Sequence, residues 1–161
     1  DFRFGRDRTG DVGVLRDLGR SGGYETVVIP LVGAGRPASS SALRALIAGG
    51  DVAAVAAELT RHHELRGTTR GSGESVTVAV PPEVAVPGAG VYAGWAGRNG
   101  AEWQPVVVRT GGGIVAVHLL ERAELLEGAP VRVRFVARMP DGQSPEAEHA
   151  FARVLLAERG Y

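Results

Sequence analysis

Two short segments of the chain gather residue types that could bind a nucleotide. Ser39, Ser40 and Ser41 come directly before a predicted helix, and Arg44 follows less than one turn later. Free backbone N–H groups, the positive end of the helix dipole and the guanidinium would converge there on one anion, most naturally a nucleotide phosphate. A serine-capped helix with a solvated arginine explains the same residues without any ligand, because such caps are common.

The second segment, residues 2–11, alternates aromatic and basic side chains. Phe2 and Phe4 flank Arg3, and Arg6 follows ahead of a predicted helix. Aromatic faces can hold a planar ring while guanidinium groups meet phosphates. The alternative is a strand end that runs into a charged loop.

Composition narrows the classes of function that such segments could serve. The 18 basic residues balance 18 acidic ones, so no net field would draw the chain to nucleic acid or to a membrane. The absence of Cys excludes disulfides, thiolate catalysis and zinc–thiolate sites. No stretch approaches the roughly 20 apolar residues of a membrane span, and the first residues form no apolar signal region. We therefore expect a soluble, cytoplasmic protein whose anion site is local.

The first third of the chain has the pattern of an α/β unit. Residues 11–18 have helical spacing, and residues 24–32 are apolar and β-branched at most positions, as in a strand covered on both faces. Residues 42–48 form a second predicted helix that ends at Gly49 and Gly50. Asp51 is the expected cap of a third helix.

Beyond Arg61 the pattern changes to short strands separated by Gly and Pro, which favours an antiparallel barrel or sandwich. Alternation in the last predicted strand places its aliphatic and aromatic residues on one face and Arg132 and Arg134 on the other. A terminal helix begins after Ser144, with Phe151, Val154 and Leu155 expected to face inward. The strands are expected at residues 75–80, 90–96, 104–109, 114–120 and 131–137.

Both chemical segments, in their order and spacing, resemble the FMN adenylyltransferase lobe of bacterial bifunctional FAD synthetases. The resemblance covers about the first sixty residues, including an Asp-Phe-Arg-Phe-Gly start and a Ser-Ser-Ser-x-x-Arg element. It implies that Ser40, Ser41 and Arg44 bind ATP phosphates, with Ser41 where the family has Thr. It also implies that Asp1, Phe2 and Phe4 line the flavin and nucleotide site. The family's His-x-Gly-His motif would lie upstream of Asp1, and no His of this chain matches it: His62 and His63 are expected at a helix end, and the others are His118 and His149.

The remaining chain resembles, more faintly, the riboflavin kinase barrel of the same family. The matching segments are residues 64–67, 87–95, 117–120 and 125–128. Residues 73–79 lack the Asn and the aligned Thr that hold Mg and ATP in that family, and Ala116 stands where it has its Glu base. Residues 110–113 replace an Asn-Pro-Thr-Phe segment. Because phosphoryl transfer needs metal-borne charge and an oriented nucleophile, we expect no catalytic residue, no metal site and no kinase activity.

Several barrel residues could still contact a flavin. Tyr92 and Trp95 are the candidates, although core packing is the commoner use of an aromatic beside a barrel strand. Trp103 has the same two explanations. The glycines of residues 67–73 could suggest a phosphate loop, but no Lys follows them, so we interpret this stretch as a turn or a disordered connection.

The sequence therefore predicts an α+β protein in two parts. Residues 1–63 would form part of a Rossmann-like nucleotidyltransferase lobe, and residues 64–161 an antiparallel split β-barrel with a C-terminal helix. The complete protein would convert FMN and ATP into FAD and pyrophosphate, with Mg as the metal. This chain alone is expected to be inactive. Its barrel is expected either to hold FMN, FAD or riboflavin or to have a structural role. Two alternatives stay open: an active riboflavin kinase with a rearranged site, and a non-catalytic module that binds a protein partner or forms a homo-oligomer. Neither nucleic acid nor a membrane is expected as a partner.

Overall fold

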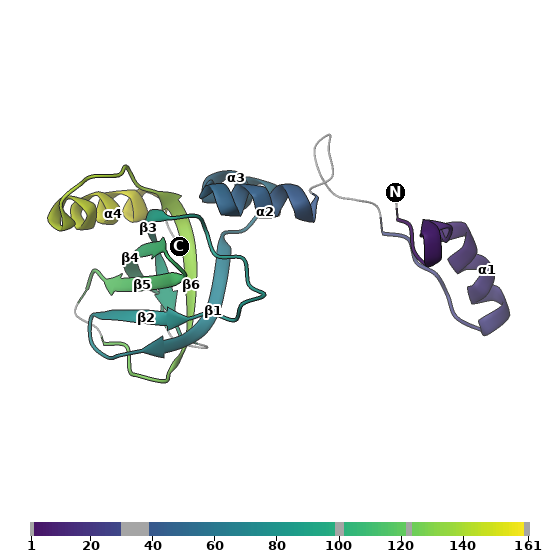
Figure 1. Cartoon of the computed structure of the whole chain (residues 1–161), viewed down its shortest axis with the longest axis horizontal. Coiled ribbons are helices and arrows are strands. Elements are labelled where there is room, and N and C mark those ends of the chain that lie inside the picture. Colours follow the sequence, from purple (N-terminus) through teal and green to yellow (C-terminus); the bar gives the residue numbers. More distant parts are fainter. Residues whose placement is uncertain (1, 30–38, 99–101, 122–123, 160–161) are drawn as a thin grey trace. The chain divides into compact units, whose positions relative to one another are not determined.

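The computed structural model describes residues 2–29, 39–98, 102–121 and 124–159 (Figure 1). The chain divides into two compact units, Asp1–Pro37 and Ala38–Tyr161, and each is considered by itself. The division falls between Pro37 and Ala38 and not between residues 63 and 64. The reason is that the helices of residues 40–59 pack with the barrel that follows them.

The first unit contains a short 3₁₀ helix, η1 (Arg6–Arg8), and helix α1 (Val12–Gly22). Asp11 caps α1, because its Oδ1 accepts a hydrogen bond of 3.1 Å from the backbone N–H of Val14. The predicted helix is confirmed, but it continues through Gly19. At that position a Cβ would lie only 2.5 Å from the carbonyl oxygen of Tyr24, so the following chain folds closely against the helix.

The buried strand predicted at residues 24–32 is absent where the structure describes it. Residues 24–29 have no strand assignment, and residues 30–32 lie outside the described residues. Val27 and Ile29 are 73% and 81% exposed. A strand of a parallel sheet needs neighbours to accept its backbone hydrogen bonds, and no described residue of this unit supplies one. The Rossmann-like lobe therefore stays a prediction.

Two consecutive helices open the second unit, α2 (Ser40–Gly49) and α3 (Val52–Leu59). The predicted caps are confirmed: Ser39 Oγ accepts from the N–H of Ala42 at 3.0 Å, and Asp51 Oδ1 accepts from that of Ala54 at 3.0 Å. Val52 and Val55 of α3 are fully buried, where the helix packs against the first and last strands of the barrel.

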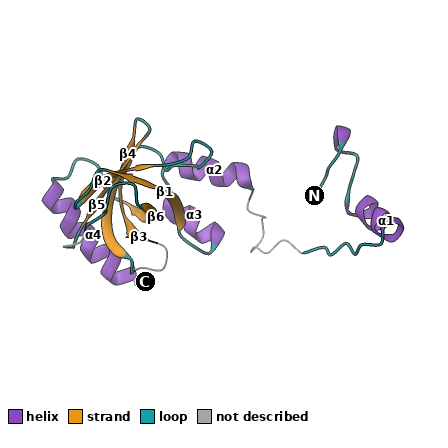
Figure 2. Cartoon of the chain, turned by 90° about the horizontal axis from the view of Figure 1, so that it is seen from below, coloured by secondary structure: helices purple, strands orange, loops and turns teal. Residues whose placement is uncertain are grey.

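Six antiparallel strands close into a barrel in the order β1-β2-β5-β4-β3-β6 (Figure 2). The predicted antiparallel barrel is confirmed, and pairing of β1 with β6 closes it. Residues 67–70 belong to β1 rather than to a turn, because the strand continues to Arg70 and pairs with β2. The strands are β1 (His63–Arg70), β2 (Ser75–Ala79), β3 (Gly90–Gly97), β4 (Gln104–Gly111), β5 (Ile114–Leu119) and β6 (Pro130–Arg138).

Alternating side chains fill the barrel interior, as period-two patterning requires. On β6 the residues Val131, Val133 and Phe135 are buried, whereas Arg132 and Arg134 face outward, as predicted. Both outward arginines bind Glu64 of β1, at 2.8 and 3.0 Å. These ion pairs therefore join β1 and β6 on the outer face of the barrel, in addition to the backbone hydrogen bonds between the two strands.

Helix α4 (Pro145–Arg159) closes the unit and packs on β3 and β4. Ser144 caps it, as predicted, with Oγ accepting from the N–H of Ala147 at 3.3 Å. The predicted inward face is wrong in part, since Phe151 and Val154 are exposed. The buried stripe instead repeats every four residues as Glu148, Ala152 and Leu156, beside partly buried Leu155. Within the described ranges, no helix is both long enough and apolar enough to cross a membrane.

Candidate functional site

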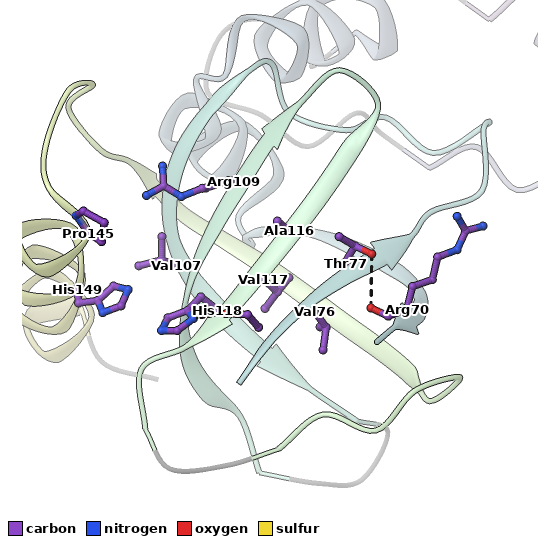
Figure 3. A pocket seen from close by; sticks show the side chains of 11 residues that line it. Arg70, Val76, Thr77, Val107, Arg109, Ala116, Val117, His118, Pro145 and His149 are labelled. Atoms are coloured by element: carbon purple, nitrogen blue, oxygen red, sulfur yellow. Dashed lines mark hydrogen bonds between the residues drawn. The ribbon is translucent and has the colours of Figure 1, made fainter. Parts of the chain in front are cut away.

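A groove of about 520 Å³ lies beside the barrel wall, where strands β2, β5 and β4 meet the start of helix α4 (Figure 3). Its volume is in the range of small-molecule sites. Polar and apolar side chains share its lining. The polar ones are Arg70, Ser75, Thr77, Arg109, His118 and His149, and the others are Val76, Val107, Ala116, Val117 and Pro145.

Two imidazoles form one wall of the groove. Ser75 lies opposite His118 on paired strands, and the Ser75 hydroxyl hydrogen-bonds to His118 Nδ1 at 2.5 Å. The His118 ring stacks on that of His149 from α4, with centroids 4.5 Å apart and planes 13° apart. The serine contact orients one ring, and the stack joins the barrel wall to the helix.

Burial lowers the pKa of His149 below its ordinary value of 6.5, and the neighbouring His118 lowers it further. Glu148 opposes this shift, Arg153 adds to it, and Glu146 opposes it again. Because desolvation is the largest cause, the uncharged ring is the form that this position favours.

An ion pair anchors the helix beside the stacked rings. The guanidinium of Arg109 on β4 donates to the carboxylate of Glu148, whose side chain is almost fully buried. Arg153, one turn further along α4, donates to the carbonyl oxygen of Leu120. These contacts fix α4 against the barrel and therefore place His149 on His118.

Thr77 and Ala116 occupy the part of the groove where the family resemblance would place a metal and a base. They are Cα partners across β2 and β5. The Thr77 hydroxyl donates to the carbonyl oxygen of Arg70 at 3.5 Å (Figure 3). None of the described lining residues carries a carboxylate, and two of them carry guanidinium groups. Since Mg²⁺ prefers carboxylate and other oxygen ligands, these residues do not fit it.

Comparison with known proteins was informative for the fold only. No family model matches the chain, and no curated protein matches it. A solved structure, described as a macrolide-efflux protein from Streptococcus pneumoniae, superposes with a TM-score of 0.68 at 20% sequence identity. The likeness shows a shared fold. It covers 86% of this chain but only 51% of that one, so the chain spans about half the length of its structural neighbour.

The predicted phosphate-binding residues lie at the start of α2 in the second unit. Ser40, Ser41 and Arg44 are all exposed on the first turns of that helix. Ser39 is the residue whose hydroxyl is used by the helix, as its cap. Ser40 and Ser41 are exposed, and their phosphate-binding role stays a prediction.

Of the predicted flavin-binding residues of the first unit, Phe2 lines a separate cavity. Phe2 and Arg3 line a space of about 920 Å³ together with α1 and residues 26–29. The ring centroids of Phe2 and Phe4 are 5.6 Å apart. The Phe4 ring also packs over Gly10, because a Cβ added to Gly10 would lie only 2.7 Å from atoms of that ring. Asp1 lies outside the described residues.

The barrel aromatics have packing roles. Tyr92 is fully buried, meets Phe135 edge to face at 5.4 Å, and donates from its hydroxyl to the carbonyl oxygen of Gly88 at 2.6 Å. The predicted flavin contact of Tyr92 does not fit this placement, because its ring belongs to the core. Trp95 packs against the apolar cluster beneath α4. Trp103 lies under the guanidinium of Arg134, 4.0 Å from its ring centre.

Sequence patterns did not reveal the imidazole pair. His118 and His149 are joined by no local spacing, because strand β5 and helix α4 meet only through tertiary packing. The helix-end position expected for His63 is also wrong: His63 lies in β1, and its Nε2 is 2.9 Å from the carbonyl oxygen of Ala85. The signal that could have indicated His118 is its outward position on a strand with buried valines, opposite Ser75.

Proposed function

We propose that this chain is a FAD synthetase-related protein whose barrel holds a flavin nucleotide without phosphorylating riboflavin. The observation that carries the proposal is the pairing of Thr77 with Ala116 inside a groove lined by cationic side chains. A space of suitable size is kept there, while the groups that would drive phosphoryl transfer are replaced.

Loss of the proton acceptor supports the absence of kinase activity. A hydroxyl that attacks a phosphorus atom needs a nearby base to take its proton. Ala116 offers a methyl group at the position that the family resemblance assigns to this base. Arg70 and Arg109 would repel a divalent cation in the same space. The carboxylate base and the metal site that the resemblance implies are therefore both unsupported in this groove.

The lining of the groove suits a flavin nucleotide as a ligand. Arg70 is exposed and can pair with a phosphate. Val107 and Ala116 supply apolar surface for the ring system. FMN, which combines a dianion with a flat ring, matches both parts of the lining.

The adenylyltransferase activity is a proposal for the complete protein only. There, FMN and ATP would give FAD and pyrophosphate, with ATP and Mg required and Ser40, Ser41 and Arg44 holding phosphates. Their exposure at a helix start supports this role. Phe2 and Phe4 would serve the flavin side of the same reaction. The cytoplasm, where the flavin nucleotides are made, is the proposed location.

Calorimetric titration of the chain with riboflavin, FMN and FAD tests the proposal, together with a chromatographic assay for FMN formed from riboflavin and Mg-ATP. We expect heat with FMN, weaker heat with riboflavin, and no new FMN. Heat with none of the flavins would overturn the binding role. Formation of FMN would instead support the alternative of a kinase with a rearranged site.

A second candidate is supported by a different observation. Phe2, Val27 and Ile29 of the first unit are exposed around one cavity, at 57%, 73% and 81%. Apolar surface of this kind marks sites of protein association. A regulatory module that binds a protein partner, or a second copy of the chain, would cover it. Sedimentation of the chain at rising concentration tests self-association. A sedimenting mass that increases with concentration in the parent, but not in the double variant F2S with I29S, would favour association through this surface.

A further inference from the structure

The stacked imidazoles occupy a position where their charge matters to any ligand of the groove. His118 and His149 lie in the same lining as Arg70 and Arg109. The charge of Arg109 is matched by Glu148, whereas Arg70 has an exposed guanidinium with no carboxylate partner among the described residues. A ligand therefore meets the uncompensated cation of Arg70, and His149 adds a second positive charge when it is protonated.

Protonating both rings would place two like charges 4.5 Å apart. Such charges repel each other, so a proton on His149 is disfavoured unless an anion is near. The charged groups that face His149 are Glu146, Glu148 and Arg153 on its own helix, His118 on β5 and Arg109 on β4, with Arg70 on β1 across the groove. Glu148 is already engaged by Arg109, so the other carboxylate that faces His149 is that of Glu146, which is exposed at the start of α4.

We infer that the groove is a proton-coupled anion site, in which a phosphate-bearing ligand binds together with uptake of a proton by His149, whose ring stacks on that of His118. The identity of that ligand as FMN rests on the function proposed above, whereas the coupling itself does not. The ligand dianion adds a counter-charge inside the groove. The affinity of the groove for dianions therefore rises as the pH falls and His149 takes up a proton.

The sign follows from the structure. Burial and the neighbouring His118 lower the pKa of His149, so the ring is uncharged at neutral pH. Bound dianion favours the charged ring and raises that pKa. By linkage, a rise of about one pH unit in the midpoint corresponds to about tenfold tighter binding to the protonated form.

The test is a proton NMR titration of the imidazole C–H signals of the whole chain, with and without sulfate at constant ionic strength set by chloride. Sulfate is chosen because it does not itself titrate near neutral pH. We expect the midpoint of His149 to rise by about one unit, while that of His63, which lies outside the groove, stays in place. H149F keeps an aromatic ring in the stack but removes the His149 signal, and the missing signal assigns that resonance.

Matched arginine variants separate a local site from a general effect of salt. R70Q removes the exposed charge of the groove and should reduce the shift of His149. R98Q removes an exposed charge that does not line the groove and should leave the shift unchanged. A midpoint that does not move with sulfate, or one that moves equally for His63, would overturn the inference.

A parallel titration with FMN distinguishes this inference from the proposed function. Shifts with both sulfate and FMN support both. A shift of the His149 midpoint with sulfate but not with FMN would exclude FMN as the ligand, while the proton-coupled anion site would still be supported. Binding of FMN with an unchanged His149 midpoint would keep the flavin role and remove the coupling.

Discussion

Thr77 on β2 faces Ala116 on β5 across a strand pair, and both side chains line the groove beside α4. This relationship leaves a methyl group at the position to which the family resemblance would assign a proton acceptor. It also leaves the Thr77 hydroxyl bound to the carbonyl oxygen of Arg70, away from any metal role. Under the proposed function, the groove binds an anion and lacks the carboxylate base that the family resemblance implies.

Replacing Ala116 by Glu should weaken FMN binding by about tenfold or more, because a carboxylate in the groove repels the phosphate and attracts the nearby cations. A116Q has the same length without the charge and should bind more nearly like the parent. Calorimetry gives both affinities. Equal binding by A116E and A116Q would mean that the phosphate lies elsewhere.

Replacing Arg109 by Leu should lower the free energy of unfolding by about 1–3 kcal/mol, because it leaves the buried carboxylate of Glu148 without its partner. Replacing both residues, in R109L with E148L, should recover much of that loss. Urea denaturation measures each value. If the double variant were no more stable than R109L, the ion pair would not be what fixes α4.

Glu64 should make the barrel sensitive to acid. Its hydrogen bond with Arg132 is the main cause that lowers its pKa from 4.5 to about 2, with Arg134 and Arg66 adding to the effect. A carboxyl with a lowered pKa stabilises the folded state above its unfolded pKa, and this contribution is lost as the pH falls from 4.5 toward 2.

E64Q should therefore be less stable than the parent at neutral pH, and the difference should shrink through that acid interval. E83Q, at an exposed position outside this cluster, is the matched control. Urea denaturation at a series of pH values provides the measurement. A difference between parent and E64Q that stayed constant with pH would contradict the assignment.

Gly94 marks a close approach of two strands. The register of β3 against β6 shifts between Ala93 and Gly94, and a Cβ at Gly94 would lie 2.1 Å from the carbonyl oxygen of Arg134. G94A should lower the free energy of unfolding by about 2 kcal/mol or more, since backbone must move to accommodate the methyl group. G49A, where a Cβ meets nothing within 4 Å, should cost little. Equal melting temperatures of the two variants would contradict the strand register.

The parts of the fold that were predictable are those set by local chemistry. Ser39, Asp51 and Ser144 are capping residues that announce helix starts, and the alternation around Arg132 and Arg134 indicates which face of β6 is buried. The strand predicted at residues 24–32 shows the limit, because an apolar β-branched run forms a strand only where another strand pairs with it.

The candidate site was predictable only in outline. The family resemblance implies that Ala116 stands in place of a base, which stays a prediction. No sequence signal near His118 indicates that His149 will stack on it, because α4 reaches the barrel wall only through tertiary contacts. The predicted flavin contact of Tyr92 does not fit its placement, since its ring lies in the core and its hydroxyl donates to the carbonyl oxygen of Gly88. A distinctive aromatic therefore indicated packing and not a ligand.

Equilibrium dialysis of FMN against the chain, with riboflavin in a parallel chamber, tests the central claim most directly. The account predicts that the chain retains FMN saturably at one molecule per chain, retains riboflavin more weakly, and loses FMN retention in A116E. Retention of neither flavin, or equal retention by the parent and A116E, would contradict it.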